Sequence, residues 1–72
     1  MKITAKIKLG AHASKIESFG NNRYLVYLIS ELGDSEAMSE FLALMSRHLG
    51  VAEKKIIYIG KDVHGDKMFE IN

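Results

Sequence analysis

Several features that often define small proteins are missing from this 72-residue chain. It contains no cysteine, which excludes a disulfide framework and any zinc site built on thiolates. Its longest apolar runs, FLALM and IIYI, are far shorter than the roughly 18 residues that a membrane-spanning helix requires. No charged start is followed by an apolar run and a cleavage site, so we expect no signal peptide and no membrane association. A cysteine-free chain fits a reducing compartment, and we expect a cytoplasmic location.

The composition that remains is that of an ordinary globular domain. Hydrophobic residues make up 47% of the chain and charged residues 26%, and there is no proline and no internal repeat. A chain of this length has room for one domain, residues 1–72. The net charge is only +1, but residues 1–16 contain four lysines and no acid. The chain is therefore not generally basic, although one of its elements can present a basic face.

Periodicity of the hydrophobic residues predicts three strands in the first part of the chain. Residues 1–9 alternate, with Ile3, Ala5, Ile7 and Leu9 on one face and lysines on the other, as in a half-buried strand. A short strand is predicted at 15–19, followed by a turn at GNN, because glycine and asparagine tolerate positive φ. Residues 23–29 are rich in aromatic and β-branched side chains, which predicts a strand partly buried on both faces.

One helix is predicted after these strands. Asp34 suits its N-cap and Gly50 its end. The apolar stripe at helical spacing consists of Met38, Phe41, Leu42, Met45 and Leu49. Beyond a short polar connection, the fully apolar run 56–59 predicts a central strand, and 67–71 predicts the last strand.

The order β-β-β-α-β-β predicts an α+β fold with two layers. One main helix packs on a four- to five-stranded sheet, antiparallel or mixed. Since one helix covers one face of a sheet, we expect the other face to be polar or to be covered by a partner.

Three segments resemble the YggU-like family of small conserved proteins of uncharacterised function. They are IKLGAHASKI (7–16), SEAMSEFLALMSRHLGV (35–51) and KKIIYIGKDVHGDKMFEI (54–71). The chain departs from the family pattern at Leu9, where proline is usual, and at 35–38, where Ser-Glu-Ala-Met replaces Gly-Lys-Ala-Asn. In the last loop only Gly60 and Lys67 match. The resemblance implies the fold, and it implies that any site built from the family's polar residues is lost or altered here.

The segment GKDVHGDK (60–67) is a candidate loop site. Gly60, Lys61 and His64 supply groups suited to an anion, although phosphate-binding loops normally lead into a helix rather than a strand. Asp62, His64 and Asp66 are possible metal ligands, but three such residues in one loop are a common accident. We predict an exposed hairpin connection and no metal site.

No pattern in the chain places a nucleophile beside a base. Ser14 lies near His12 in the sequence, and other serines lie on or near the helix, without a nucleophile elbow. We therefore predict no catalytic residue, no cofactor and no enzymatic activity.

The lysines of the first strand are candidate nucleic-acid ligands. Lys2, Lys6 and Lys8 project from one face, alternate positions being about 6–7 Å apart. The predicted set is Lys2, Lys6, Lys8, Lys15 and Lys67. Tyr24 or Tyr27 would stack bases, and RNA is preferred to DNA. Against this reading, strand lysines also prevent edge pairing and keep a protein soluble. The alternative function is a protein–protein interaction module or homodimer that uses exposed sheet surface.

Overall fold

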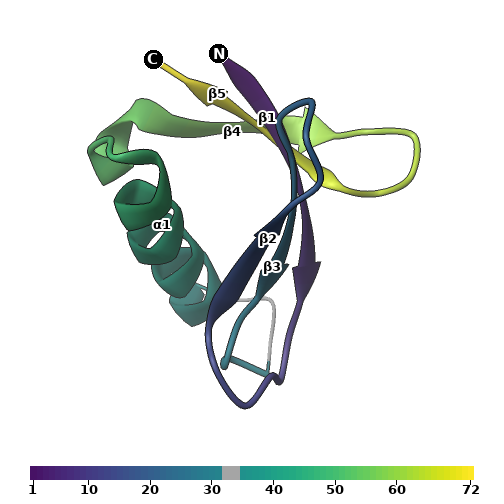
Figure 1. Ribbon diagram of the computed structural model, residues 1–72, viewed down its shortest axis with the longest axis vertical. Helices are drawn as coiled ribbons and strands as arrows, with labels where there is room; N and C mark the ends of the chain where they lie inside the picture. The colour runs from purple at the N-terminus through teal and green to yellow at the C-terminus, as the bar shows by residue number, and fades with distance from the viewer. Residues whose placement is uncertain (32–34) are drawn as a thin grey trace.

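The computed structural model describes residues 1–31 and 35–72, and within them one α-helix packs on a five-stranded mixed sheet (Figure 1). This confirms the predicted α+β fold and its order of elements. The elements are β1 (Lys2–Lys8), β2 (Lys15–Ser18), β3 (Arg23–Tyr27), α1 (Ser35–Leu49), a 3₁₀ turn η1 (Glu53–Lys55), β4 (Ile56–Lys61) and β5 (Lys67–Ile71). No helix in the described residues is long and apolar enough to cross a membrane.

The strands are arranged in the order β2-β3-β1-β5-β4, so the first strand lies at the centre of the sheet. β1 runs parallel to β3 and antiparallel to β5, while β2–β3 and β4–β5 are antiparallel hairpins. The predicted GNN turn joins β2 to β3 with positive φ at Gly20, Asn21 and Asn22. Its left-handed backbone matches the tolerance of glycine and asparagine for that region.

The core lies between α1 and one face of the sheet. Phe41 of α1 stacks on Phe69 of β5, with ring centroids 4.6 Å apart. Stacked aromatic pairs of this kind add to the stabilisation that comes from burial alone. The buried hydrophobic residues are Ile3, Ala5, Val26, Leu28, Ala37, Phe41, Met45, Ile56, Phe69 and Ile71. The alternation predicted for β1 is confirmed, since Ile3 and Ala5 are buried while its lysines are exposed.

The helix follows its prediction closely. Phe41 and Met45 are buried, and Met38, Leu42 and Leu49 pack partly against the core. It ends at Leu49, and Gly50 adopts φ 72°, where only glycine is free of strain. The predicted cap at Asp34 lies outside the described residues.

The prediction of a central strand at 56–59 is wrong. β4 lies at the edge of the sheet and pairs only with β5, so Ile57, Tyr58 and Ile59 remain 42%, 45% and 46% exposed. A short apolar run specifies a strand but not its position, because strand order is set by pairing with distant segments.

The carboxylate of Glu40 joins α1 to two loops. It accepts hydrogen bonds from the Ile29 amide at 2.7 Å and from the amide and hydroxyl of Ser30 at 3.0 and 2.9 Å. Ser14, in the loop before β2, donates a fourth at 2.7 Å. Desolvation acts to raise the pKa of Glu40, but the bonds from Ile29, Ser14 and Ser30 outweigh it and lower that pKa to about 2.

Replacement of Glu40 by alanine is expected to destabilise the fold by about 1–2 kcal/mol at pH 7, because hydrogen bonds to a charged acceptor are lost. The folded-state pKa is depressed, so this contribution is present above the ordinary carboxyl pKa and disappears as the pH falls from about 5 to 2. Urea denaturation at several pH values measures the free energy of unfolding of the wild-type and Glu40→Ala proteins. The two free energies should converge near pH 2. Glu40→Gln keeps the shape of the acceptor without its charge, so its free energy of unfolding at pH 7 should lie between those of the other two proteins. A difference in stability that does not change with pH would contradict the role assigned to the charged carboxylate.

Candidate nucleic-acid interface

The face of the sheet opposite α1 carries the lysines of β1, and we call it the open face. Residues that pair in register on neighbouring strands place their side chains on the same face of the sheet. The pairing therefore identifies which residues of the other strands share a face with the β1 lysines. Lys6 pairs with Leu25, Lys8 pairs with Tyr27, and Lys2 pairs with Glu70. The open face includes Lys2, Thr4, Lys6 and Lys8 of β1, Arg23, Leu25 and Tyr27 of β3, Lys15 and Glu17 of β2, Met68 and Glu70 of β5, and Ile57 of β4.

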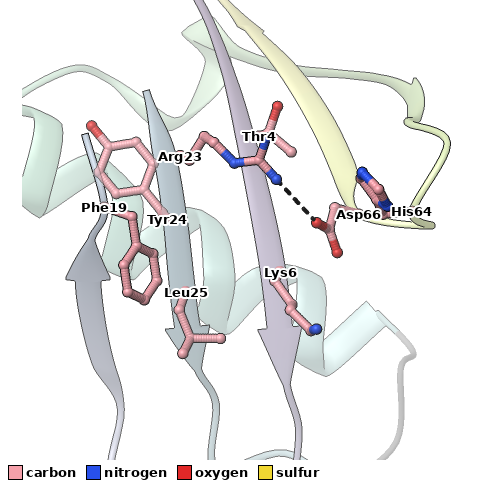
Figure 2. A pocket seen from close by; sticks show the side chains of 8 residues that line it. All are labelled: Thr4, Lys6, Phe19, Arg23, Tyr24, Leu25, His64 and Asp66. Atoms are coloured by element: carbon pink, nitrogen blue, oxygen red, sulfur yellow. Dashed lines mark ion pairs between the residues drawn. The ribbon is translucent and has the colours of Figure 1, made fainter. Parts of the chain in front are cut away.

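A hollow of about 440 Å³ lies on the open face. Three parts of the chain surround it: strands β1 and β3, the turn after β2, and the loop between β4 and β5 (Figure 2). Its lining residues are Thr4, Lys6, Phe19, Arg23, Tyr24, Leu25, His64 and Asp66. A shallow site of this kind, with the cations Lys6 and Arg23 and the aromatic residues Phe19 and Tyr24, suits a flat polar ligand that bears negative charge.

Arg23 and Asp66 form the electrostatic centre of the hollow. The guanidinium of Arg23 extends across β1 toward Asp66, and the closest N···O distance is 3.9 Å (Figure 2). The Arg23 side chain is 53% exposed and that of Asp66 is 14% exposed. At this separation the ion pair between the guanidinium and the carboxylate is weak. The guanidinium carries further N–H donors, and within the described residues Arg23 forms no other ion pair, so these donors are available to a ligand.

Phe19, like Arg23, is a residue of the hollow that the sequence did not identify. Its side chain is 65% exposed and lies next to Leu25 (Figure 2). The turn holds it in place, since the Phe19 amide donates to the Arg23 carbonyl at 3.0 Å and the Arg23 amide donates to Gly20. In the sequence, Phe19 is recognisable as an aromatic residue immediately before the GNN turn, and residues that border a surface turn are commonly exposed.

The structure separates the two tyrosines that were predicted to stack bases. Tyr27 lies on the open face, with the Lys15 ammonium 5.7 Å from its ring centroid. Tyr24 borders the hollow, but its ring packs edge-on to His48 of α1 at 5.7 Å. Of the two, only Tyr27 presents its ring on the lysine-bearing face.

The five predicted lysines do not all share one surface. Lys2, Lys6 and Lys8 lie together on the open face, and Lys15 lies beside them in an ion pair with Glu17 at 3.2 Å. Lys67 pairs in register with Ala5, on the face toward α1, and its ammonium lies 5.5 Å from the Tyr58 ring. It borders a second, apolar hollow rather than the basic one.

The segment GKDVHGDK is a hairpin connection, as predicted, with residues 62–66 between β4 and β5. Asp62 holds the loop, because its Oδ1 accepts the amides of His64 and Asp66, both at 2.9 Å. Desolvation acts to raise the pKa of Asp62, and these two hydrogen bonds outweigh it and lower that pKa. Of the loop candidates, His64 borders the hollow, Lys61 is exposed, and Gly60 takes φ 134° at an irregularity in β4.

In the residues that the structure describes, no group of three or more His, Cys, Asp or Glu side chains could hold a metal ion. Comparison with family models, curated proteins and solved structures found no significant similarity to this chain. The resemblance to the YggU-like family therefore stays a prediction.

Replacing Asp62 with alanine removes the acceptor of the loop and is expected to expose the amides of His64 and Asp66 to solvent exchange. Hydrogen exchange followed by NMR measures this, with roughly tenfold faster exchange expected at those two positions, because their amides lose the acceptor that protects them. Asp62→Asn keeps an oxygen at Oδ1 and serves as the control with near-native rates. Equal rates in all three proteins would show that Asp62 does not organise the loop.

Proposed function

We propose that the protein is a non-enzymatic binding module whose open face binds single-stranded nucleic acid, with RNA as the preferred ligand. The observation that carries the proposal is the exposed Phe19 ring in a hollow that is also lined by Lys6 and Arg23. Bases stack on exposed aromatic rings, while phosphates pair with cations beside them.

The position of the lysines in the sheet removes one of the alternative explanations. Lysines on an edge strand prevent pairing with other chains, but β1 is the central strand and is paired on both sides. Lys2, Lys6 and Lys8 therefore do not protect an exposed sheet edge from pairing with another chain. Strand geometry places Lys6 and Lys8 about 6–7 Å apart and Lys2 about 13 Å from Lys6, with Thr4 between them. The Lys6–Lys8 spacing lets these two lysines contact successive phosphates.

The aromatic groups favour a single strand over a duplex. A base reaches the Phe19 ring only when it is unstacked from its neighbours, which is the ordinary state of single-stranded RNA. Tyr27 lies farther along the same face, next to Lys8 in register, and offers a second ring. Two rings beside a row of cations form the arrangement that sequence-tolerant single-strand binders use.

Carboxylates on the open face limit the affinity. Glu17 pairs with Lys15, Glu70 pairs with the N-terminal ammonium at 3.0 Å, and Asp66 faces Arg23. The cations left to contact phosphates are Lys2, Lys6, Lys8 and the remaining donors of Arg23, so we expect about three or four phosphate contacts. The slope of log K against log salt concentration should then be about −2 to −3.

The test is a titration with an eight-nucleotide single-stranded RNA, followed by fluorescence anisotropy and by amide shifts. Lys6→Ala is expected to weaken binding about threefold to tenfold and to reduce the salt slope by about 0.7, because one phosphate contact is lost. Phe19→Ala should weaken binding at least about fivefold without changing the slope, because a stacking contact of about 1–3 kcal/mol carries no charge.

Arg47→Ala is the matched control, since it removes an exposed cation from α1, on the other layer of the domain. It should leave both affinity and slope unchanged. An RNA that shifts no amides of β1 or β3, or equal losses in all three variants, would refute the proposal.

A further inference from the structure

The two edges of the sheet differ in how well they are protected. β2 is a short edge strand, and the loop before it is tied to α1 through Ser14 and Glu40. β4 is six residues long, and Ile57, Tyr58 and Ile59 in its middle are each more than 40% exposed. Long apolar edges are unusual in proteins that do not pair them, because the unpaired backbone groups accept a further strand.

We propose that the β4 edge binds an extended segment of another protein, with apolar residues at its centre and acidic residues on both sides. The interaction is strand addition: backbone hydrogen bonds provide affinity, and alternate side chains provide selectivity. This surface is distinct from the lysine row of the nucleic-acid site, since β5 lies between β4 and β1.

Both faces of β4 offer apolar contacts to an added strand. Ile57 pairs in register with Glu70 and so lies on the open face. Tyr58 pairs with Phe69 and points toward the α1 side, with ring centroids 5.5 Å apart. A partner with apolar residues at successive positions therefore buries one side chain against each face.

Charge at the ends of β4 identifies the chemistry of the partner. Lys55 precedes the strand and Lys61 ends it, and both are exposed. Within the part of the chain that the structure describes, neither forms an ion pair. Two nearby carboxylates are engaged, Glu70 by the N-terminal ammonium and Asp62 by loop amides, while the exposed Glu53 forms no ion pair with Lys55 in the described residues. The lysines are thus available to acidic residues of a partner.

The same lysines disfavour a second copy of this chain as the occupant. In an antiparallel pair centred on Tyr58, which matches the exposed residues 57–59 to themselves, Lys55 of each copy lies opposite Lys61 of the other. Like charges in directly opposed positions destabilise a sheet. The register shift between Tyr58 and Gly60 also limits the length of regular pairing, which suits a short segment better than a long strand.

The test uses two synthetic peptides, acetyl-Glu-Glu-Val-Val-Thr-Glu-Glu-amide and the same peptide with lysine in place of each glutamate. The acidic peptide is expected to bind at about 100 µM or tighter and to shift the amides of residues 55–61, with the lysine peptide at least about tenfold weaker. A third peptide has the acidic sequence with both valines N-methylated, so it lacks two backbone N–H donors. It should bind at least about fivefold more weakly than the unmethylated acidic peptide. Analytical ultracentrifugation of the free protein should give a monomer.

Lys55→Glu combined with Lys61→Glu is expected to reverse the preference in favour of the lysine peptide, whereas Arg47→Glu, an equal charge reversal on α1, should not. No binding of the acidic peptide, equal binding of the two peptides, or shifts confined to β1 and β3 would each overturn the proposal. A dimer abolished by the paired lysine reversal or by Ile57→Lys would overturn it in favour of self-association.

Discussion

One helix can cover one face of a five-stranded sheet, and the surface chemistry of this protein follows from that limit. The apolar stripe of α1 meets Phe69, Ile3 and Val26 on one face, and these contacts account for most of the core. Since strand side chains alternate, the residues between the core positions must face water. In β1 those residues are three lysines and Thr4, so the packing that buries Ile3 and Ala5 also fixes Lys2, Lys6 and Lys8 on one exposed face.

Carboxylates contribute to the structure mainly by holding loops. Glu40 accepts hydrogen bonds from both the segment after β3 and the loop before β2, so it fixes the approach of the chain to α1. Asp62 does the same for the hairpin between β4 and β5, which brings His64 and Asp66 to the rim of the hollow. A carboxylate that accepts several amide bonds has its charge partly offset locally, and nearby cations stay free to act on a ligand.

The sequence predicts what depends on local pattern and misses what depends on strand order. The alternation of β1, the stripe and end of α1, and the hairpin at 60–67 are local, and all are confirmed. The placement of β4 depends on which strand pairs with β5, and hydropathy carries no information on that. For the same reason Lys67 was grouped with lysines from which the sheet separates it, and Phe19 and Arg23 were overlooked. Phe19 and Arg23 lie near Lys6 only because β3 pairs in parallel with β1. That pairing joins segments distant in the sequence, which a local pattern does not predict.

The basic open face and the β4 edge can be occupied together without strong interference. β5 lies between β1 and β4, and neighbouring strands are about 4.8 Å apart, which puts the lysine row about 10 Å from the edge strand. The Debye length at physiological ionic strength is about 8 Å, so acidic groups beside Lys55 and Lys61 are largely screened from Lys2 and Lys6. An acidic segment on the edge would therefore compete only weakly with phosphates on the open face. At low ionic strength the screening length exceeds this separation, and the two ligands should then oppose each other through the solvent, with no change in the fold.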